Sequence, residues 1–419
     1  MFEKTTFSNG FRVLTSVNPN VRSATVAMFV SAGSRYESDE LGGAFHFIEH
    51  MCFKGTNRMP TSQEISETIE GVGGIMNAST DREETIFWIK VASTHLPLAL
   101  HLLVDMLGDS IFDVNEIEKE RQVILEELAM TRDRPEDLVF QLTETTLWPN
   151  QPLGRDVGGT PISVQGISKS NLLSCMQSQY TPQNLVLVVT GNVVHEEIVE
   201  LLSGKFQNWF DGFPMKFFPL EDTSSPSNIS LQNRPSDSAH ICLGVPALAS
   251  SDPGRFALHV LNTVLGDGMS SRLFLELREN EGLVYTVNSE VAAFRDTGAL
   301  FIYCATQPKN AYRSVELILK EMEKLSLGVT VKEIQKAKEQ IKGRILLRME
   351  DTLNTALWLG SQELVRNCIM TPDEVTTAID KVTPDDIVEL MGSIGVRQKM
   401  CLGVVGPYKS TGRFEKLFR

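Results

Sequence analysis

The chain has 419 residues, of which 42% are apolar and 22% charged, and it carries a formal net charge of −14 with a pI of about 5.1. This length exceeds one ordinary core, so two to three domains are expected, with the composition of a soluble globular protein. The acidic balance argues against nucleic acid as a partner and is compatible with basic or extended polypeptides, although a solvated acidic surface explains it more simply.

Cysteine usage and the N-terminus predict a cytoplasmic protein. The six cysteines are scattered without a CxxC pair, which indicates reduced, mostly buried thiols. The first residues, MFEKTTFSNGFRVLTSV, lack the apolar core of a signal peptide, and the most apolar stretches are short or contain His and Asp. We therefore expect no membrane segment.

Strand and helix patterns alternate along the first half of the chain. RSATVAMFVSAG and ETIFWIKVAS alternate or cluster apolar residues as strands do, and THLPLALHLLVDMLGD has the periodicity of an amphipathic helix. Between the two strands lies GAFHFIEHMC, which contains two of only seven histidines. This apolar segment is the first candidate for a functional site.

The histidine segment has metal-ligand spacing. His46 and His50 are four residues apart, so on a helix both imidazoles share one face, about 6 Å apart. Two imidazoles at this spacing suit one Zn²⁺, and Glu49 lies beside them to act on a metal-bound water. HxxEH inverts the commoner HExxH zinc-peptidase pattern. The alternative is a helix with two packed histidines and no metal.

A catalytic zinc with two His ligands usually takes a carboxylate as its third. DVNEIEKERQVILEELAMTRDRPED predicts a helix that begins near Asp113. At 100° per residue, its apolar stripe has both Glu120 and Glu127 at its edge, whereas Glu126 faces solvent. Helical phase therefore leaves Glu120 and Glu127 as candidates.

The chain is predicted to contain two copies of one unit. Residues 212–228 are rich in Pro and Ser, as linkers are, and the segments on either side resemble each other at an offset of about 215, so that Gly191 corresponds to Gly406. We expect an α+β fold of two homologous αβ-sandwich domains with mixed sheets, at 1–211 and 229–419. Chance similarity between α/β segments is the alternative.

The two copies differ at the histidine cluster. AFHFIEHMCFKG aligns with ALHVLNTVLGDG, so His46 meets a histidine while Glu49 and His50 meet Asn262 and Thr263. Only the first copy keeps the cluster, which favours a functional over a purely structural role.

Four segments resemble the pitrilysin/insulinase family of inverted-motif (HxxEH) zinc peptidases, in particular its short-chain processing-peptidase branch: ELGGAFHFIEHMCFKGT, EKERQVILEEL, WPNQPLGRDVGG and GDGMSSRLFLELRENEGLVYTV. They lie in both halves of the chain. The resemblance implies a zinc-dependent endopeptidase with one Zn²⁺ per chain that cleaves short or unfolded polypeptides inside a closed chamber, with Glu49 as general base. The alternative function is a non-catalytic or regulatory partner subunit of a processing-peptidase-like heterodimer.

The resemblance also implies roles for individual residues. In the family the third ligand lies 77 positions beyond the second histidine, which is Glu127 here, and the outer-shell glutamate corresponds to Glu120. The Arg and Tyr that hold substrate correspond to Arg278 and Tyr285 in RENEGLVY. The edge strand that pairs with peptides corresponds to GGIMNAST, with Asn77, Ala78 and Ser79 as its contact residues.

The resemblance bears on assembly as well. In the larger relatives four such units form the chamber, so two units per chain imply a homodimer in which the zinc site of one protomer faces Arg278 and Tyr285 of the other. A heterodimer is the alternative.

Overall fold

The computed structural model describes residues 2–205, 209–210, 212–221 and 228–418. The chain divides into two compact units, each assembled from three segments. Unit 1 comprises Met1–Ala129, Asp156–Phe218 and Leu346–Thr371. Unit 2 comprises Met130–Arg155, Pro219–Ile345 and Pro372–Arg419.

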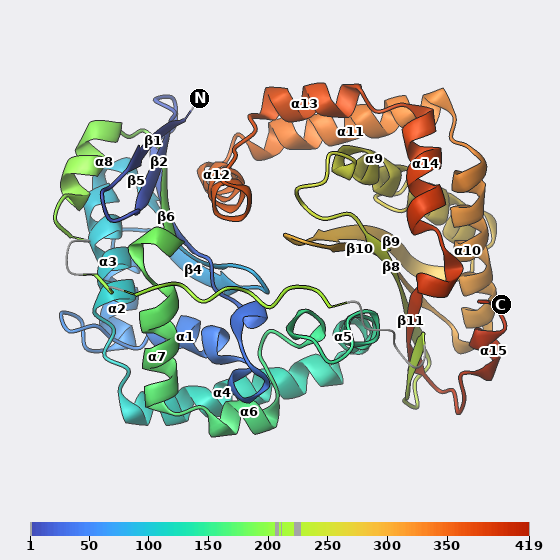
Figure 1. The fold of residues 1–419 in the computed structure, drawn as a ribbon, viewed down its shortest axis with the longest axis horizontal. Helices are drawn as coiled ribbons and strands as arrows, with labels where there is room; N and C mark the ends of the chain where they lie inside the picture. The colour runs from blue at the N-terminus through green and yellow to red at the C-terminus, as the bar shows by residue number, and fades with distance from the viewer. Residues whose placement is uncertain (1, 206–208, 211, 222–227, 419) are drawn as a thin grey trace. The chain divides into compact units, whose positions relative to one another are not determined.

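Unit 1 is built on a six-stranded mixed sheet in the order β1-β2-β6-β3-β5-β4 (Figure 1). Only β2 and β6 run parallel; the other neighbours are antiparallel. The strands are β1 (Glu3–Thr6), β2 (Arg12–Val17), β3 (Ser23–Val30), β4 (Ile75–Thr80), β5 (Thr85–Ala92) and β6 (Leu185–Gly191). The β4 strand is an edge strand whose residues alternate between exposed and half-buried, as one accessible face requires.

Helices cover both faces of this sheet, which explains why the central β6 is buried along its whole length. One face belongs to the main core, which contains residues of α1, α2, α3, α4 and α7. The other packs against α12 (Thr352–Arg366), where a side chain at Gly360 would collide with the ring of Phe29. The other helices that contribute to unit 1 are α1 (Ala44–Cys52), α2 (Ser62–Glu70), α3 (Leu96–Gly108), α4 (Val114–Asp133), α6 (Pro161–Gly166), α7 (Lys169–Gln179) and α8 (His195–Leu202).

Unit 2 has a five-stranded sheet in the order β7-β11-β8-β10-β9. Its strands are β7 (Ile229–Asn233), β8 (Ala239–Ala247), β9 (Val284–Ala293), β10 (Gly298–Thr306) and β11 (Cys401–Gly406). Its helices are α5 (Pro135–Leu147), α9 (Arg255–Leu265), the π-helix η6 (Phe274–Asn280), α10 (Ala311–Leu327), α11 (Val331–Arg348), α13 (Pro372–Asp380), α14 (Pro384–Ile394) and α15 (Gly412–Glu415).

The two sheets confirm the predicted duplication and the α+β class. Strands β2-β6-β3-β5-β4 and β7-β11-β8-β10-β9 follow the same spatial order, and each set contains one parallel pair at the same place. The helices that precede β6 and β11 begin with equivalent capping boxes, at Ser168 and Thr383, which are 215 residues apart. Each copy therefore repeats one succession of strands and helices.

The units differ from the predicted boundaries of 1–211 and 229–419 because two equivalent segments are exchanged. Met130–Arg155, with α5, joins unit 2, where α5 packs against β8 and β11. Leu346–Thr371, with α12, joins unit 1, where α12 packs against β3 and β6. Each sheet thus receives its second covering helix from the other half of the chain. Residues 211 and 222–227, at the predicted linker, lie outside the described residues.

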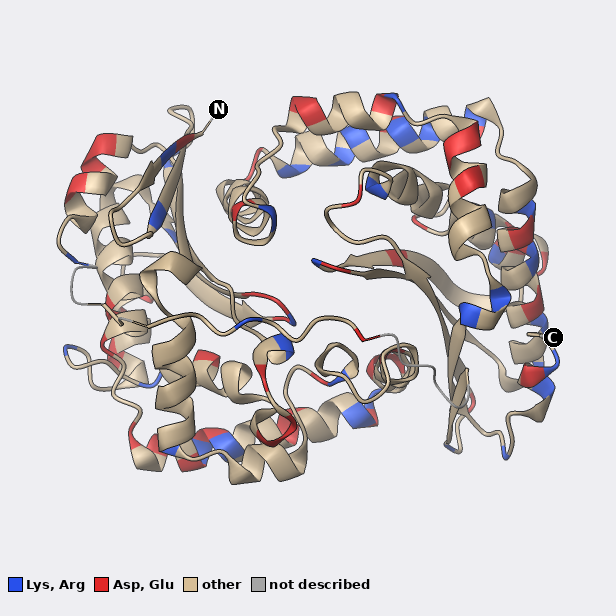
Figure 2. Cartoon of the chain, in the orientation of Figure 1, with Lys and Arg blue, Asp and Glu red and all other residues tan. Residues whose placement is uncertain are grey.

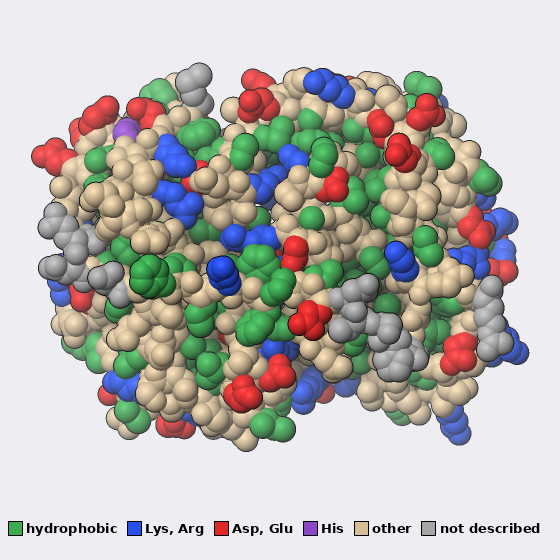
Figure 3. Space-filling model, viewed as in Figure 1, with side chains coloured by type: hydrophobic (Ala, Val, Ile, Leu, Met, Phe, Trp, Pro, Cys, Tyr) green, Lys and Arg blue, Asp and Glu red, His purple; other side chains and the backbone are tan. Residues whose placement is uncertain are grey.

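The surface carries charges of both signs. In Figure 2 charged residues are concentrated on helices and loops while the strands are largely tan, and Figure 3 shows both signs interspersed on the face in view. Among the described residues, no helix combines the length and the apolar character that crossing a membrane would require.

Candidate metal centre

Helix α1 carries the histidine segment and is held at both its apolar face and its N-terminus. Phe45, Phe47 and Ile48 are fully buried and fix its orientation. Gly43, just before the helix, has φ +92°, and a Cβ there would lie 2.4 Å from the carbonyl oxygen of Gly158. These contacts leave little freedom in where the helix starts.

The N-terminus of α1 is capped from outside the helix by a buried carboxylate. Glu37, 2% exposed, accepts hydrogen bonds from the backbone N–H groups of Gly43 and Phe45, both at 2.8 Å. A carboxylate at this end satisfies two orphan donors and interacts favourably with the helix dipole. The position of the histidines therefore depends on Glu37.

Three side chains of unit 1 converge as a metal site requires. The Nε2 atoms of His46 and His50 are 3.3 Å apart, and Oε2 of Glu127 on α4 lies 3.8 Å from the first and 3.6 Å from the second. Within the described residues this is the one group of three or more His, Cys, Asp or Glu side chains arranged to hold a metal ion.

The arrangement fits a tetrahedral zinc. Two nitrogens each about 2.05 Å from a tetrahedral ion are roughly 3.3 Å apart, which is the separation of the two Nε2 atoms. The slightly longer distances to Glu127 need only a small side-chain adjustment. Two imidazoles and one carboxylate supply three ligands, the number typical of catalytic sites with a position open to water.

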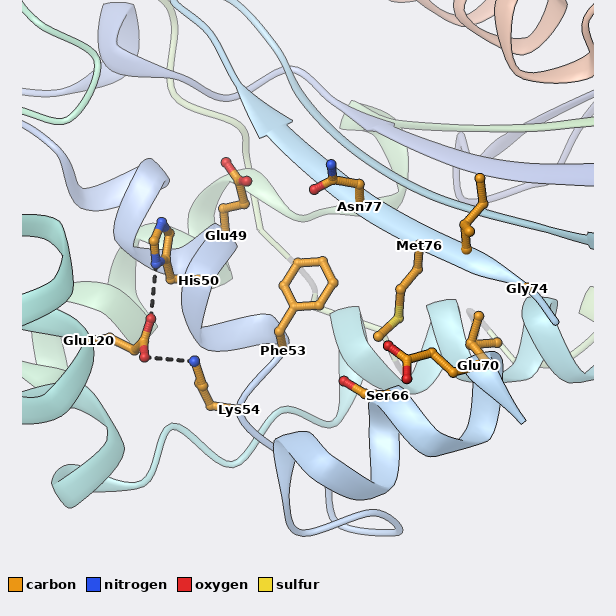
Figure 4. Close-up of a pocket in the computed structure, with 12 residues that line it drawn as sticks. Glu49, His50, Phe53, Lys54, Ser66, Glu70, Gly74, Met76, Asn77 and Glu120 are labelled. Carbon is orange, nitrogen blue, oxygen red and sulfur yellow. Dashed lines mark hydrogen bonds and ion pairs between the residues drawn. The ribbon is translucent and has the colours of Figure 1, made fainter. Parts of the chain in front are cut away.

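His50 and His46 differ in the contacts of their Nδ1 atoms. Nδ1 of His50 lies 3.0 Å from Oε2 of Glu120, whose Oε1 is 2.6 Å from Nζ of Lys54, as the dashed lines in Figure 4 show. Nδ1 of His46 is buried and has no hydrogen-bond partner in the part of the chain that the structure describes. Glu120 therefore orients one imidazole of the pair.

Burial and charge act differently on the two histidines. Burial, with a smaller contribution from the charge of His50, lowers the pKa of His46 to about 4, so this imidazole is neutral at neutral pH. Burial also lowers the pKa of His50, but the hydrogen bond to Glu120 and the charges of Glu127, Glu120 and Glu49 outweigh it and raise the pKa overall. The surrounding carboxylates thus favour positive charge at His50, as they would favour a cation.

Glu49 lies on α1 directly before His50, and its carboxylate is held by Thr80. Oγ1 of Thr80, at the end of β4, donates to Oε2 of Glu49 at 2.5 Å. Burial raises the pKa of Glu49, an effect that the hydrogen bond from Thr80 partly offsets. A carboxyl group with a raised pKa next to a candidate metal site suits proton transfer.

A cavity of about 440 Å³ adjoins the centre and is lined by residues of α1, α2, β4 and α4 and of the segments just after α1 and just before β4. Figure 4 shows Glu49 and His50 on α1, Met76 and Asn77 on β4, and Ser66 and Glu70 on α2. Phe53, Ile69 and Met76 contribute apolar surface, while Lys54, Glu70 and Glu120 contribute charge. The cavity is large enough for one or two amino-acid side chains.

The remaining predicted site residues lie on two edge strands and a helix. Asn77, Ala78 and Ser79 lie on β4, with Asn77 and Ser79 exposed. In unit 2, Arg278 is exposed in η6 with its guanidinium 5.0 Å from the ring of Phe274, and Tyr285 on β9 is 83% exposed.

Unit 2 has a polar contact where unit 1 has its metal group. Asn262 on α9, which aligns with Glu49, accepts a 2.7 Å hydrogen bond from the hydroxyl of Ser289 on β9. Asn262 and the aligned Thr263 are both largely buried. The hydrogen bond between Asn262 and Ser289 connects α9 to the edge strand β9.

Comparison with known proteins places both halves in one family. A family model described as Insulinase (Peptidase family M16) matches residues 12–161, and one described as Peptidase M16 inactive domain matches residues 166–341. The chain belongs to peptidase family M16. The description of the second domain as inactive agrees with the position of the metal group in unit 1.

Relatives cover nearly the whole chain. An uncharacterized zinc protease of Streptomyces coelicolor is 36% identical over 97% of this chain and 90% of its own. The zinc protease YmxG of Bacillus subtilis is 34% identical over 91% and 93%. The mitochondrial-processing peptidase subunit beta of Lentinula edodes is 32% identical over 92% and 85%.

Solved structures share the fold. A protease from Helicobacter pylori superposes with a TM-score of 0.89 at 22% identity, covering 97% of this chain and 99% of that one. A chain of complex III2 from Candida albicans gives 0.84 at 18% identity, with 99% of both covered.

Sequence reasoning missed three residues at the centre: Glu37, Lys54 and Thr80. Lys54 lies four residues after His50, but α1 ends at Cys52, so helical periodicity does not place Lys54 beside His50. Thr80 ends the edge-strand segment, but its contact with Glu49 depends on how β4 packs against α1. Glu37 gives no local signal, because it caps a helix that begins seven residues later.

Proposed function

We propose that this member of family M16 is a zinc-dependent endopeptidase. The main support is that His46, His50 and Glu127 bring three ligand atoms within 4.8 Å of one another. Glu49 lies next to His50 on the same helix. The relatives named zinc proteases and mitochondrial-processing peptidase subunit beta support zinc as the metal and peptides as substrates.

His46, His50 and Glu127 would hold the zinc, which when bound would supply a water molecule of lowered pKa and polarise the scissile carbonyl. Glu49 accepts the proton that this water loses and delivers it to the nitrogen of the departing amine. Oε2 of this carboxylate accepts a hydrogen bond from the hydroxyl of Thr80, and Oε1 is the proposed proton acceptor. Glu120 orients His50 through the Nδ1 atom of the imidazole, and Lys54 is the counter-ion of Glu120.

The proposed substrates are short or unfolded polypeptides. Their main chain would add as a strand to the edge of β4 at Asn77, Ala78 and Ser79, which makes binding tolerant of sequence. One substrate side chain would occupy the cavity next to Glu49. Arg278 and Tyr285 would bind substrate from a second protomer, in a homodimer that forms a closed chamber.

Metal analysis combined with peptide cleavage tests the proposal. Purified protein should contain one zinc per chain and cut an unstructured basic peptide, and a chelator should abolish cleavage until zinc is restored. His50→Ala should lose the metal and the activity, because two ligands bind zinc weakly. His101→Ala on α3 is the matched control and should keep both. Full zinc occupancy in His50→Ala would contradict the ligand assignment.

A further inference from the structure

Thr80 connects the strand that borders the cavity to the carboxylate beside the metal group. It is the last residue of β4, and its hydroxyl donates to Oε2 of Glu49 at 2.5 Å. This distance is that of a charge-assisted O–H···O⁻ hydrogen bond, the stronger kind for a hydroxyl donor. Thr80 itself is half-buried, so solvent competes little for this bond.

The hydrogen bond from Thr80 restricts the orientation of the Glu49 carboxylate as well as its position. A glutamate side chain has three rotatable bonds, and anchoring one oxygen restricts the carboxylate to a narrow set of orientations. Because the hydroxyl of Thr80 engages Oε2, we assign acceptance of the water proton to Oε1. Displacing a reacting group by about 1 Å can cost on the order of 100-fold in rate. A hydroxyl that restricts this freedom therefore contributes to turnover.

Neighbouring residues show that the donation is specific. Thr85 lies directly opposite Thr80 on β5, yet its hydroxyl donates to the backbone carbonyl of Ala32 at 3.1 Å. Two cross-strand threonines thus have different acceptors, one in the backbone and one in the proposed base. Thr85 offers a control of identical residue type in the same strand pair.

We propose that Thr80 is a positioning residue that holds Glu49 for proton transfer, so that β4 both receives the substrate and orients the base. This inference rests on the zinc-peptidase proposal. Thr80 acts through Glu49, which is not one of the three proposed metal ligands. Its loss should lower kcat and leave KM and zinc content close to those of wild type.

The experiment compares three substitutions in the full-length protein. Thr80→Val removes the hydroxyl at nearly constant volume and should lower kcat roughly 10- to 100-fold. Thr80→Ser keeps a hydroxyl and should recover most of the activity. Thr85→Val should leave kcat within about twofold of wild type, although it can lower thermal stability because the carbonyl of Ala32 loses its donor.

Each outcome decides a different claim. A wild-type protein that binds zinc but cuts no peptide refutes the peptidase proposal, independently of Thr80. Wild-type kcat in a folded, zinc-loaded Thr80→Val variant overturns the positioning role. An equal loss in Thr80→Val and Thr85→Val, or in Thr80→Ser, also overturns it, because the cause is then the strand pair and not the hydroxyl.

Discussion

At the scale of single residues, the centre depends on a chain of contacts that extends outward from the metal ligands. His50 meets Glu120, and Glu120 meets Lys54, so the carboxylate that orients one imidazole is itself held by an ammonium group. Burial raises the pKa of Glu120, but its bonds to His50 and Lys54 outweigh burial and lower the pKa overall. The acceptor thus stays ionised, as a donor imidazole requires.

Glu120→Gln tests this outer contact. The amide keeps the volume but is a weaker acceptor, and it can turn its NH₂ group toward His50. We expect zinc affinity or activity to fall roughly 10- to 100-fold without complete loss of the metal. Chelator competition and peptide kinetics measure the two effects. Glu126→Gln, on the exposed side of the same helix, is the control and should match wild type. An inert Glu120→Gln variant would assign Glu120 to packing alone.

Helical periodicity accounts for what the sequence could predict about these residues. It places His46 and His50 on one face and separates the exposed Glu126 from Glu120 and Glu127. It could not choose between Glu120 and Glu127, because residues seven apart share a face; the family resemblance made that choice. Thr80 and Glu37 act across tertiary contacts, which periodicity within one element does not contain.

At the scale of elements, α1 is positioned by Glu37, which lies outside the helix. Glu37 follows the short 3₁₀ turn η1 (Ser34–Tyr36) and reaches the two N–H groups at the start of α1. The preceding Arg35 is fully buried and pairs with Glu83 at 2.5 Å, in the turn between β4 and β5. One short segment therefore contacts both the metal-bearing helix and the end of the edge-strand hairpin.

Glu37→Gln should weaken this capping. An amide can accept only through its oxygen, so one of the two N–H groups loses its acceptor, at a cost of about 1–3 kcal/mol. We expect a lower Tm and weaker zinc binding, since α1 carries both histidines. Glu64→Gln is the matched control, because Glu64 caps the exposed start of α2. It should lower the Tm less and leave zinc affinity unchanged. Equal zinc affinity in Glu37→Gln would mean that α1 is held by its core contacts alone.

Element types and order were predictable, whereas the exchange of α5 and α12 was not. Internal similarity at an offset of about 215 residues predicted equivalent helices, and the capping boxes at Ser168 and Thr383 agree with it. Yet α5 and α12 are amphipathic helices at equivalent places in the two copies, and each can cover a sheet of the same design. Nothing in a local pattern states which sheet a helix covers.

At the scale of the whole molecule, the two copies have diverged in chemistry while keeping one topology. The proposed base and ligands lie in unit 1, whereas Arg278 and Tyr285 lie in unit 2. In the proposed homodimer each active site combines a metal group from one protomer with the Arg/Tyr pair of the other. A symmetric dimer then contains two equivalent sites.

Mixing inactive variants tests this assembly. Glu49→Gln protomers and Arg278→Ala/Tyr285→Ala protomers should each be nearly inactive alone. After subunit exchange, a heterodimer contains one site with both components intact, so random mixing should restore about a quarter of wild-type activity. Wild type diluted with Glu49→Gln protomers provides the reference. No recovery despite demonstrated exchange would show that each site is built within one chain.

The most direct test of the central claim is the metal content and turnover of Glu49→Gln. The substitution removes the proposed base, leaves His46, His50 and Glu127 in place, and preserves the volume of the side chain. We predict one zinc per chain, an unchanged Tm, and a kcat several orders of magnitude below that of wild type. Cleavage at the wild-type rate by the zinc-loaded variant would contradict the assignment of Glu49 as the base and, with it, the mechanism proposed for this centre.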